Sequence, residues 1–286
     1  MKIAYQGISG AYSEIAADNF AKENNYKKIE TIGCRTFEEV FEGVDSGKFE
    51  FGVVPAENSL AGSIYRTFDL LSRFEVRVSG EIYVHVNHNL VVLPNAKKED
   101  IQEVYSHWQA LNQCEYNLKK TFPNAKVIEF YDTAGASAMI KEKGNIYKAA
   151  ISSEKAAKIY GLKSLIKNFQ DEKNNFTRFL VIGKKYAKFE KDTIAKQKKV
   201  NFKTSLIFAG KDVTGFLFKA LACFSLRDIN LTKIESRPVP KSPWQNYFYL
   251  DFEGKFDDEK VKHAIENLKE VASEVKILGS YKAFKM

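Results

Sequence analysis

Three polar residues, Glu57, Asn58 and Ser59, follow the apolar run Phe51 to Pro55 after a single alanine. The apolar run predicts a buried strand that ends at the proline. Open α/β sheets bind ligands beyond the carboxyl ends of their strands, and there this triplet would offer a carboxylate, an amide and a hydroxyl together. The same residue types also cap helices, so the pattern alone leaves both interpretations open.

Hydroxyl and amide groups also stand where three helices are predicted to begin. The turn Gly7 to Gly10 precedes a helix near Ser13, and free N–H groups at a helix start can hold an anion. Ser106 and Gln113 flank the start of a second helix, and Thr133 opens a third. Each of these residues has an alternative interpretation as an ordinary turn, cap or solvated side chain.

The strand predicted from Phe176 to Gly183 begins with reactive side chains. Thr177 carries a hydroxyl, and Arg178 carries a guanidinium that can pair with a carboxylate through two parallel N–H bonds. Phe179 follows them directly. The alternative is a half-buried strand in which Thr177 pairs only with its neighbours.

The sequence predicts neither a metal site nor a cofactor. His85 and His88 lie three residues apart in a β-rich run, where side chains at that spacing point to opposite faces. The three cysteines are far apart and form no Cys-x-x-Cys pair, so we expect them to be reduced and mostly buried. No phosphate-binding loop or dinucleotide fingerprint is present in the sequence.

Alternating short strands and helices must position these groups. The alternation predicts an α/β fold with largely parallel sheets and helices on their faces. The long β-rich run Val76 to Pro94 is typical of a crossover into a second lobe. We therefore expect residues 1–75 and 165–183 to share lobe 1, and residues 80–160 to form lobe 2.

The last third of the chain predicts a separate small domain. Residues 184–202 are rich in lysine with little periodicity and predict a linker. Beyond them, over residues 203–283, the expected order is strand, helix, strand, strand, helix, strand. That order is the ferredoxin-like βαββαβ arrangement.

Composition excludes several classes of protein. Of the 286 residues, 44% are hydrophobic and 28% charged, which are ordinary globular values. Only seven of the 44 basic residues are arginine and the lysines are dispersed, so we expect no nucleic-acid partner. No apolar run could span a membrane, and the amino end has no apolar core of a secretion signal. We expect a cytoplasmic protein whose net charge of +8 attracts anionic substrates.

In this order and at these intervals the polar segments resemble those of the prephenate dehydratase family, over about residues 1–283. The matching segments are Gly10-x-Tyr12-Ser13, Val54-Pro55-x-Glu57-Asn58-Ser59, Ser106-His107-x-Gln109-Ala110-Leu111-x-Gln113-Cys114, Thr133-Ala134 and Asn175-x-Thr177-Arg178-Phe179. Ala11 stands where the family usually has Thr, and Trp108 replaces a usual Pro. Asp132 to Ala136 is more similar to the plant arogenate dehydratases, so arogenate is an alternative substrate.

The resemblance implies a two-lobed, periplasmic-binding-protein-like catalytic domain over residues 1–183, with substrate between the lobes. It implies a hydro-lyase that converts prephenate to phenylpyruvate, with loss of water and carbon dioxide, in phenylalanine biosynthesis. Thr177 is then the essential hydroxyl and Glu57 a candidate proton relay, while Asn58, Ser106 and Gln113 hold the substrate. The further substrate-binding candidates are Ser13, Ser59, Thr133, Arg178 and Phe179. Arg178 is assigned to the side-chain carboxylate of the substrate.

The small domain resembles the family's ACT regulatory domain through Gly215-x-Leu217 and Glu235-Ser236-Arg237-Pro238. The resemblance implies that phenylalanine binds between two ACT domains and inhibits the enzyme, hence a homodimer or homotetramer. The candidate contacts are Gly215, Phe216, Leu217, Asn230, Leu231, Glu235, Ser236 and Arg237. The alternatives are an arogenate dehydratase that makes phenylalanine directly and, more distantly, a non-catalytic solute-binding or amino-acid-sensing protein.

Overall fold

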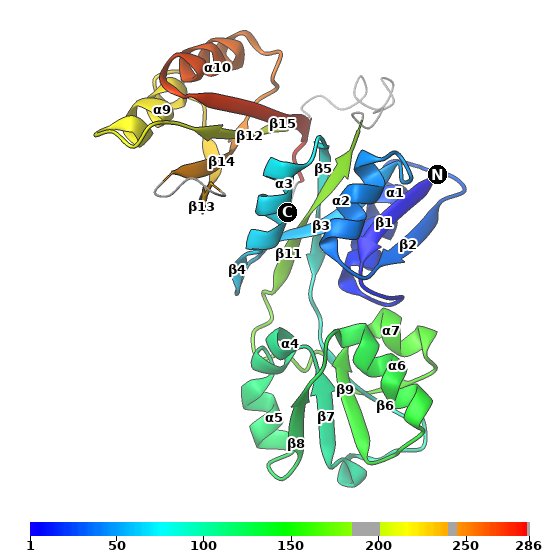
Figure 1. Cartoon of the computed structure of the whole chain (residues 1–286). Helices are drawn as coiled ribbons and strands as arrows, with labels where there is room; N and C mark the ends of the chain where they lie inside the picture. The colour runs from blue at the N-terminus through cyan, green and yellow to red at the C-terminus, as the bar shows by residue number, and fades with distance from the viewer. Residues whose placement is uncertain (185–200, 240–244, 285–286) are drawn as a thin grey trace.

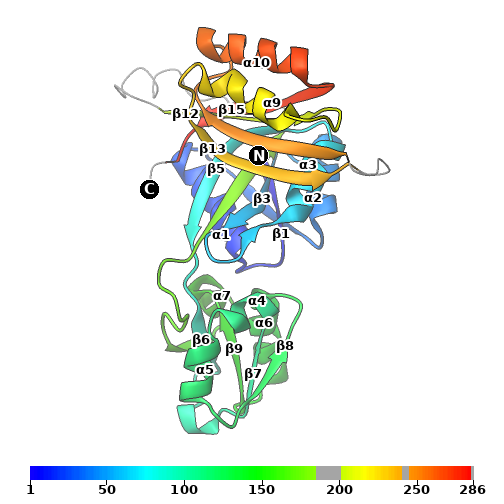
Figure 2. The same cartoon turned by 90° about the vertical axis from the view of Figure 1, so that its left-hand side faces the viewer.

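The computed structural model describes residues 1–184, 201–239 and 245–284, which form three units built on three sheets (Figure 1). Lobe 1 and lobe 2 lie end to end, and the C-terminal domain packs against lobe 1 at the end remote from lobe 2 (Figures 1 and 2). The expected two-lobed α/β architecture with a ferredoxin-like C-terminal domain is confirmed.

Lobe 1 is a mixed sheet with strand order β2-β1-β3-β11-β5, to which the short β4 adds by pairing with β3. Its elements are β1 (Lys2–Gln6), α1 (Tyr12–Glu23), β2 (Glu30–Cys34), α2 (Phe37–Asp45), β3 (Phe51–Asn58), β4 (Gly62–Ser63), α3 (Tyr65–Arg73), β5 (Arg77–His85) and β11 (Phe176–Gly183). β1 is parallel to β2 and β3, whereas β11 is antiparallel to both β3 and β5. The sheet is therefore less parallel than expected, because the chain leaves lobe 1 along β5 and returns along β11.

Lobe 2 is a smaller mixed sheet with strand order β10-β6-β9-β7-β8. Its elements are β6 (Asn89–Val92), a 3₁₀ turn (Lys98–Asp100), β7 (Glu103–Ser106), α4 (Trp108–Asn112), α5 (Glu115–Thr121), β8 (Lys126–Glu129), α6 (Thr133–Lys143), β9 (Lys148–Ser152), α7 (Glu154–Ile159) and β10 (Lys163–Ile166). Asp132 and Ser153 cap α6 and α7 by accepting hydrogen bonds from backbone N–H groups of the first turn.

The strand pairing revises the expected boundaries of the two lobes. Residues 80–85 belong to β5, which pairs with β11 in lobe 1 rather than lying in lobe 2. Conversely, β10 (163–166) pairs with β6 in lobe 2, so lobe 1 resumes later than residue 165. Alternating polarity identified the strands but not their sheets, because pairing partners are remote in sequence. The expected linker, residues 184–202, lies mostly on residues 185–200, outside the described part of the chain.

The C-terminal domain has the predicted βαββαβ order, with strands arranged β13-β14-β12-β15. Its elements are β12 (Phe202–Ala209), α9 (Phe216–Ser225), β13 (Leu231–Pro238), β14 (Asn246–Glu253), α10 (Glu259–Val271) and β15 (Glu274–Lys282). The two helices cover one face of the sheet, where Phe208, Phe252 and Phe224 belong to one buried cluster. The side chains that alternate with them along the strands point to the opposite face of the sheet.

The opposite face of this sheet packs against lobe 1. Ile207, Tyr249 and Tyr281 join residues of lobe 1, among them Phe68 and Leu180, in one buried cluster. The Tyr249 hydroxyl donates to the backbone carbonyl of Phe68 at 2.6 Å. A core shared between the two units holds the C-terminal domain in a fixed place on lobe 1.

Candidate active site

The end of β3 and the start of β11 bring Asn58 and Thr177 into contact. Asn58 Nδ2 donates to Thr177 Oγ1 at 3.0 Å and to Asn175 Oδ1 at 2.7 Å. Asn58 Oδ1 accepts from the backbone N–H groups of Leu60 (3.1 Å) and Ala61 (2.9 Å). These N–H donors fix the orientation of the amide, so its NH₂ group must face Thr177.

The hydroxyl of Thr177 is consequently oriented as a donor. Its oxygen accepts from Asn58, and within the described residues the structure gives this hydroxyl no second partner. The side chain is not sealed, since Thr177 is 8% exposed. An O–H whose oxygen already accepts a protein hydrogen bond can direct its hydrogen toward a bound ligand.

A chain of hydrogen bonds continues from Asn58 into lobe 2. Asn175 Nδ2 donates to Gln113 Oε1 at 2.9 Å, and the same oxygen lies 2.9 Å from His88 Nε2. His88 Nδ1 lies 3.3 Å from the hydroxyl of Tyr12, which donates to a backbone carbonyl. Burial lowers the pKa of His88 to about 4, so its imidazole is neutral near pH 7.

Lobes 1 and 2 also meet at the first helix of lobe 1. Ser153 Oγ donates to the carbonyl of Gly10 at 2.6 Å, and Lys155 Nζ lies 2.8 Å from a carboxylate oxygen of Glu14. A Cβ on Gly10 would lie 2.6 Å from the backbone of Ala156, and Gly10 has a φ of +94°. Only glycine therefore allows this approach of the two lobes.

The helix starts that carry Ser13 and Thr133 belong to opposite lobes and face this same contact. Ala11 and Ala134, one at each helix start, belong to one buried cluster. Asp132 caps α6 through Gly135 N at 2.9 Å. Its second carboxylate oxygen lies 3.2 Å from where a Cβ on Gly7 would stand. The lobes thus meet at one junction. The hydrogen-bonded chain from Thr177 through Asn58 to Gln113 crosses it, and the helix starts that carry Ser13 and Thr133 lie at it.

Two of the predicted site residues point away from this junction. Glu57 alternates with Asn58 along β3, and its carboxylate lies 3.4 Å from Lys233 Nζ of the C-terminal domain. Arg178 alternates with Thr177 and is 5% exposed; it pairs with Glu81 at 2.8 Å and with Asp251 of the C-terminal domain at 2.6 Å. The assignments of a proton relay to Glu57 and a substrate carboxylate to Arg178 are therefore wrong.

Phe179 and two serines have structural roles. Phe179 is buried with Ile3 and Phe20 in the core of lobe 1, so its assignment to substrate binding is wrong. The Ser106 hydroxyl is fully buried and donates to the carbonyl of Ile151 at 2.7 Å, which joins β7 to β9 instead of facing a ligand. Ser59 Oγ accepts from the backbone N–H of Phe176 at 2.9 Å and so joins β3 to β11.

Of the candidate phenylalanine contacts, some are exposed near the start of α9, whereas others pack into the core or point toward lobe 1. Gly215 has a φ of +79° at the start of α9, and Leu217 is exposed beside it. Phe216 packs into the core of the C-terminal domain, as does Leu231. Glu235 interacts with Ser63 of lobe 1, and Arg237 forms a bidentate ion pair with Asp69 at 2.9 and 3.1 Å, so both side chains point toward lobe 1.

The two remaining candidates, Ser236 and Asn230, are exposed and lie toward opposite ends of the sheet, with Asn230 at the end remote from Gly215. Ser236 lies on the face of β13 opposite to Glu235 and Arg237, because strand side chains alternate. Asn230 is exposed, and its backbone carbonyl accepts from Glu253 N at 2.9 Å.

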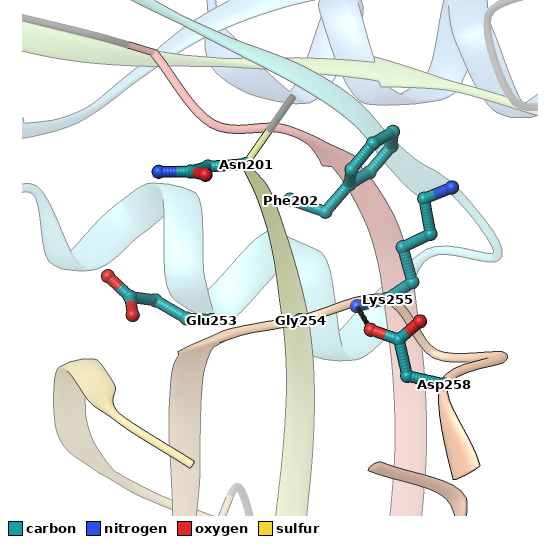
Figure 3. Close-up of a pocket in the computed structure, with 6 residues that line it drawn as sticks. All are labelled: Asn201, Phe202, Glu253, Gly254, Lys255 and Asp258. Atoms are coloured by element: carbon teal, nitrogen blue, oxygen red, sulfur yellow. Dashed lines mark hydrogen bonds between the residues drawn. The ribbon is translucent and has the colours of Figure 1, made fainter. Parts of the chain in front are cut away.

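A separate pocket of about 350 Å³ opens at the other end of β12 from Gly215, lined by Asn201, Phe202, Glu253, Gly254, Lys255 and Asp258 (Figure 3). Lys255 Nζ lies 4.3 Å from the centre of the Phe202 ring, and Lys255 N donates to Asp258 Oδ2 at 2.8 Å. The carboxylates of Glu253 and Asp258 and the ammonium of Lys255 line this pocket. The pocket lies outside the junction between the lobes.

Within the described residues, no group of three His, Cys, Asp or Glu side chains could hold a metal ion. Cys34, Cys114 and Cys223 are free thiols and buried, as expected. No helix in the described part of the chain is long and apolar enough to cross a membrane.

Sequence reasoning missed the roles of His88 and Asn175. Asn175 stands in a matching segment but was not assigned, and His88 was weighed only as a metal ligand. The sequence does place His88 in the run that crosses between the lobes. A polar side chain buried there needs hydrogen-bond partners, and both lobes can supply them.

Comparisons with known proteins point to one family. The family model of prephenate dehydratase matches residues 3–187. A chloroplastic arogenate dehydratase/prephenate dehydratase of Arabidopsis thaliana is 41% identical, over 98% of this chain and 72% of its own length.

Two solved structures resemble nearly the whole chain. A prephenate dehydratase of Arthrobacter aurescens in complex with L-Phe has a TM-score of 0.87 at 26% identity, covering 99% of this chain and 90% of that one. A protein described as a novel type of quorum quenching acylase has a TM-score of 0.86 at 28% identity, covering 99% and 98%. Because the family model spans both lobes and the plant relative spans the chain almost completely, the chain belongs to the prephenate dehydratase family.

Proposed function

We propose that this protein converts prephenate to phenylpyruvate at the junction between its lobes. The observation that carries the proposal is the donor orientation of the Thr177 hydroxyl, which Asn58 imposes. In the reaction the ring carboxylate leaves as carbon dioxide, its bonding electron pair completes the aromatic ring, and the C–O bond to the ring hydroxyl breaks. The departing oxygen needs a hydrogen-bond donor and one proton to become water.

Different residues of the junction assist the departing oxygen and hold the substrate. Thr177 donates its hydroxyl hydrogen bond to the departing oxygen, and solvent supplies the net proton, because Glu57 lies elsewhere. Gln113 Nε2 has no partner within the described residues and is available to donate to the substrate. Ser13 and Thr133, in the first turns of α1 and α6, carry hydroxyls that can donate hydrogen bonds to the carboxylate of the substrate side chain.

The test compares Thr177→Val with Thr177→Ser by following phenylpyruvate formation from prephenate. Thr177→Val keeps the shape but removes the hydroxyl, so we expect kcat to fall by ~10²-fold or more. Thr177→Ser keeps the hydroxyl and should stay within ~10-fold of wild type. Near wild-type turnover by a folded Thr177→Val protein would contradict the role of Thr177, and no turnover by the wild type would refute the activity.

Arogenate is the second candidate substrate. It carries an ammonium group on the side chain where prephenate carries a keto group, and the carboxylate of Asp132 faces the lobe contact beside Gly7. The Arabidopsis relative is named for both substrates. Because the acylase-like neighbour shares the fold at 28% identity, the fold does not choose the chemistry. Measuring kcat/KM for prephenate and arogenate on the same preparation decides which substrate is preferred.

We further propose that phenylalanine binds at the start of α9 between two copies of the C-terminal domain and inhibits the enzyme. The related Arthrobacter structure contains L-Phe, and Gly215 leaves its surroundings open, with no atom within 4 Å of a Cβ placed there. Phe218, Leu226 and Ile234 are exposed apolar side chains on α9, just after it and on β13. They support a homodimer or homotetramer built through this domain. The expected cytoplasmic location stays a prediction, since the Arabidopsis relative is chloroplastic.

Calorimetry with phenylalanine tests this site. We expect Gly215→Val to abolish the binding heat and the inhibition, because valine cannot adopt a φ of +79° without strain. Gly47→Val is the matched control: Gly47 has the same φ of +79° and equally open space, but it lies in a turn of lobe 1. Binding of phenylalanine to Gly215→Val with wild-type affinity would refute this site.

A further inference from the structure

His88 lies at the centre of the junction without an assigned task. It follows β5 in the segment that leaves lobe 1, and it is 2% exposed. Its backbone is held on both sides, since its N–H donates to Gln170 Oε1 at 2.9 Å and its carbonyl accepts from Phe169 N at 2.6 Å. The ring of Tyr12 packs edge-on against its imidazole at a centroid distance of 5.7 Å. Its imidazole is therefore fixed in place.

The directions of the surrounding hydrogen bonds determine which imidazole nitrogen carries the hydrogen. Asn58 donates to Asn175 Oδ1, so the amide NH₂ of Asn175 must face Gln113 Oε1. Gln113 Oε1 therefore acts as an acceptor, and the nitrogen of His88 that lies 2.9 Å from it must be a donor. The neutral imidazole thus carries its hydrogen on Nε2 and leaves Nδ1 toward the Tyr12 hydroxyl.

Two donors, His88 Nε2–H and Asn175 Nδ2–H, therefore hold one oxygen of Gln113. Because Oε1 of Gln113 faces these two donors, its Nε2 group points away from His88 and Asn175. We propose that His88 is a positioning residue that fixes the side-chain amide of Gln113, so that Gln113 Nε2 donates to the substrate beside Thr177. This role rests on the proposed reaction at the same junction.

Two substitutions separate the hydrogen bond from the volume of the ring. His88→Phe fills the space but has no donor, and one of the two bonds that hold Gln113 is lost. We expect kcat to fall roughly 10- to 100-fold, with a much smaller change in KM. His88→Gln can place its amide nitrogen near the position of Nε2 and should recover most of the loss. His85→Phe is the matched control, because exposed His85 contacts the carbonyl of Lys173 and should leave kcat near wild type.

A double-variant cycle distinguishes positioning from general structural support. If His88 acts through Gln113, adding His88→Phe to Gln113→Leu costs little further kcat. A merely structural role would multiply the two losses. A folded His88→Phe protein with wild-type kcat, or losses that multiply, would overturn the proposal.

A measurement without substrate keeps the two proposals distinguishable. Nitrogen-15 NMR of the imidazoles should show one histidine as the neutral Nε2–H tautomer at pH 7, and the signal should vanish in His88→Gln. An Nδ1–H tautomer or an imidazolium at that position would overturn the role of His88 even if the enzyme is active. Absence of turnover by wild type, with the Nε2–H tautomer present, would refute the reaction and with it the catalytic part of the role.

Discussion

Burial of a neutral His88 makes the stability of the protein depend on pH. Desolvation lowers its pKa to about 4 in the folded protein, while an unfolded chain has a histidine pKa of about 6.5. Between these values the unfolded chain binds a proton that the folded protein does not. The contribution to the free energy of unfolding is therefore complete above about pH 6.5 and is lost as the pH falls toward 4.

We expect this difference in urea unfolding at pH 7.5 and pH 5. From the two pKa values, His88 accounts for about 2 kcal/mol of the stability lost between these conditions. His88→Gln removes the titrating group and should show a pH dependence smaller by about that amount. His85→Gln, at an exposed position, should keep the wild-type dependence. Equal slopes for wild type and His88→Gln would contradict the assignment.

At the scale of elements, the two faces of β11 contact different parts of the molecule. Thr177 faces Asn58 and the lobe junction, whereas Arg178 faces the C-terminal domain. Burial alone would lower the pKa of Arg178, but the charges and hydroxyls around it, with Asp251 foremost, raise that pKa well above its usual value. Its guanidinium also donates to the hydroxyl of Tyr281 at 2.9 Å. A buried cation thus links β11 to two strands of the C-terminal domain.

Removing this cation should destabilise the protein strongly. Arg178→Met leaves the buried carboxylates of Glu81 and Asp251 without their shared partner, which costs about 3–5 kcal/mol in comparable cases. Lys119→Met is the control, since the exposed ion pair Lys119–Glu115 is screened by solvent and should contribute little to stability. Urea unfolding measures both, and the triple variant with Glu81→Gln and Asp251→Asn should recover part of the loss. Unchanged stability of Arg178→Met would contradict this account.

The sequence was sufficient to predict which segments form helices and which form strands. The alternation of side chains along the strands also predicts which site residues share a face of the sheet. The predicted βαββαβ order of the C-terminal domain appears in the structure. Alternation along β3 and β11 places Glu57 and Arg178 on the face opposite to Asn58 and Thr177. What the sequence could not supply was the occupant of that opposite face, because docking of the C-terminal domain is a contact between remote segments.

At the scale of the whole molecule, two chain segments join the lobes, and they are bonded to each other. The outgoing segment after β5 and the returning segment before β11 pair through Val86 N and the carbonyl of Asn175 at 2.8 Å. Both segments contribute to the hydrogen-bonded chain that reaches Thr177, through His88 and Asn175. A rotation of one lobe against the other therefore strains the hydrogen-bonded chain that ends at the Thr177 hydroxyl.

The position of β11 between β3 and β5 has a consequence for synthesis on the ribosome. Lobe 1 lacks an inner strand of its sheet until the whole of lobe 2 has been translated, a wait of about ten seconds at ~5–20 residues per second. Lobe 2 is continuous in sequence, so we expect it to become protease-resistant first on nascent chains stalled at increasing lengths. Resistance of residues 1–75 before β11 emerges would contradict this order. The amino-terminal residues would then be the first to be made and among the last to fold. Their apolar segments would stay exposed meanwhile, as chaperone binding requires.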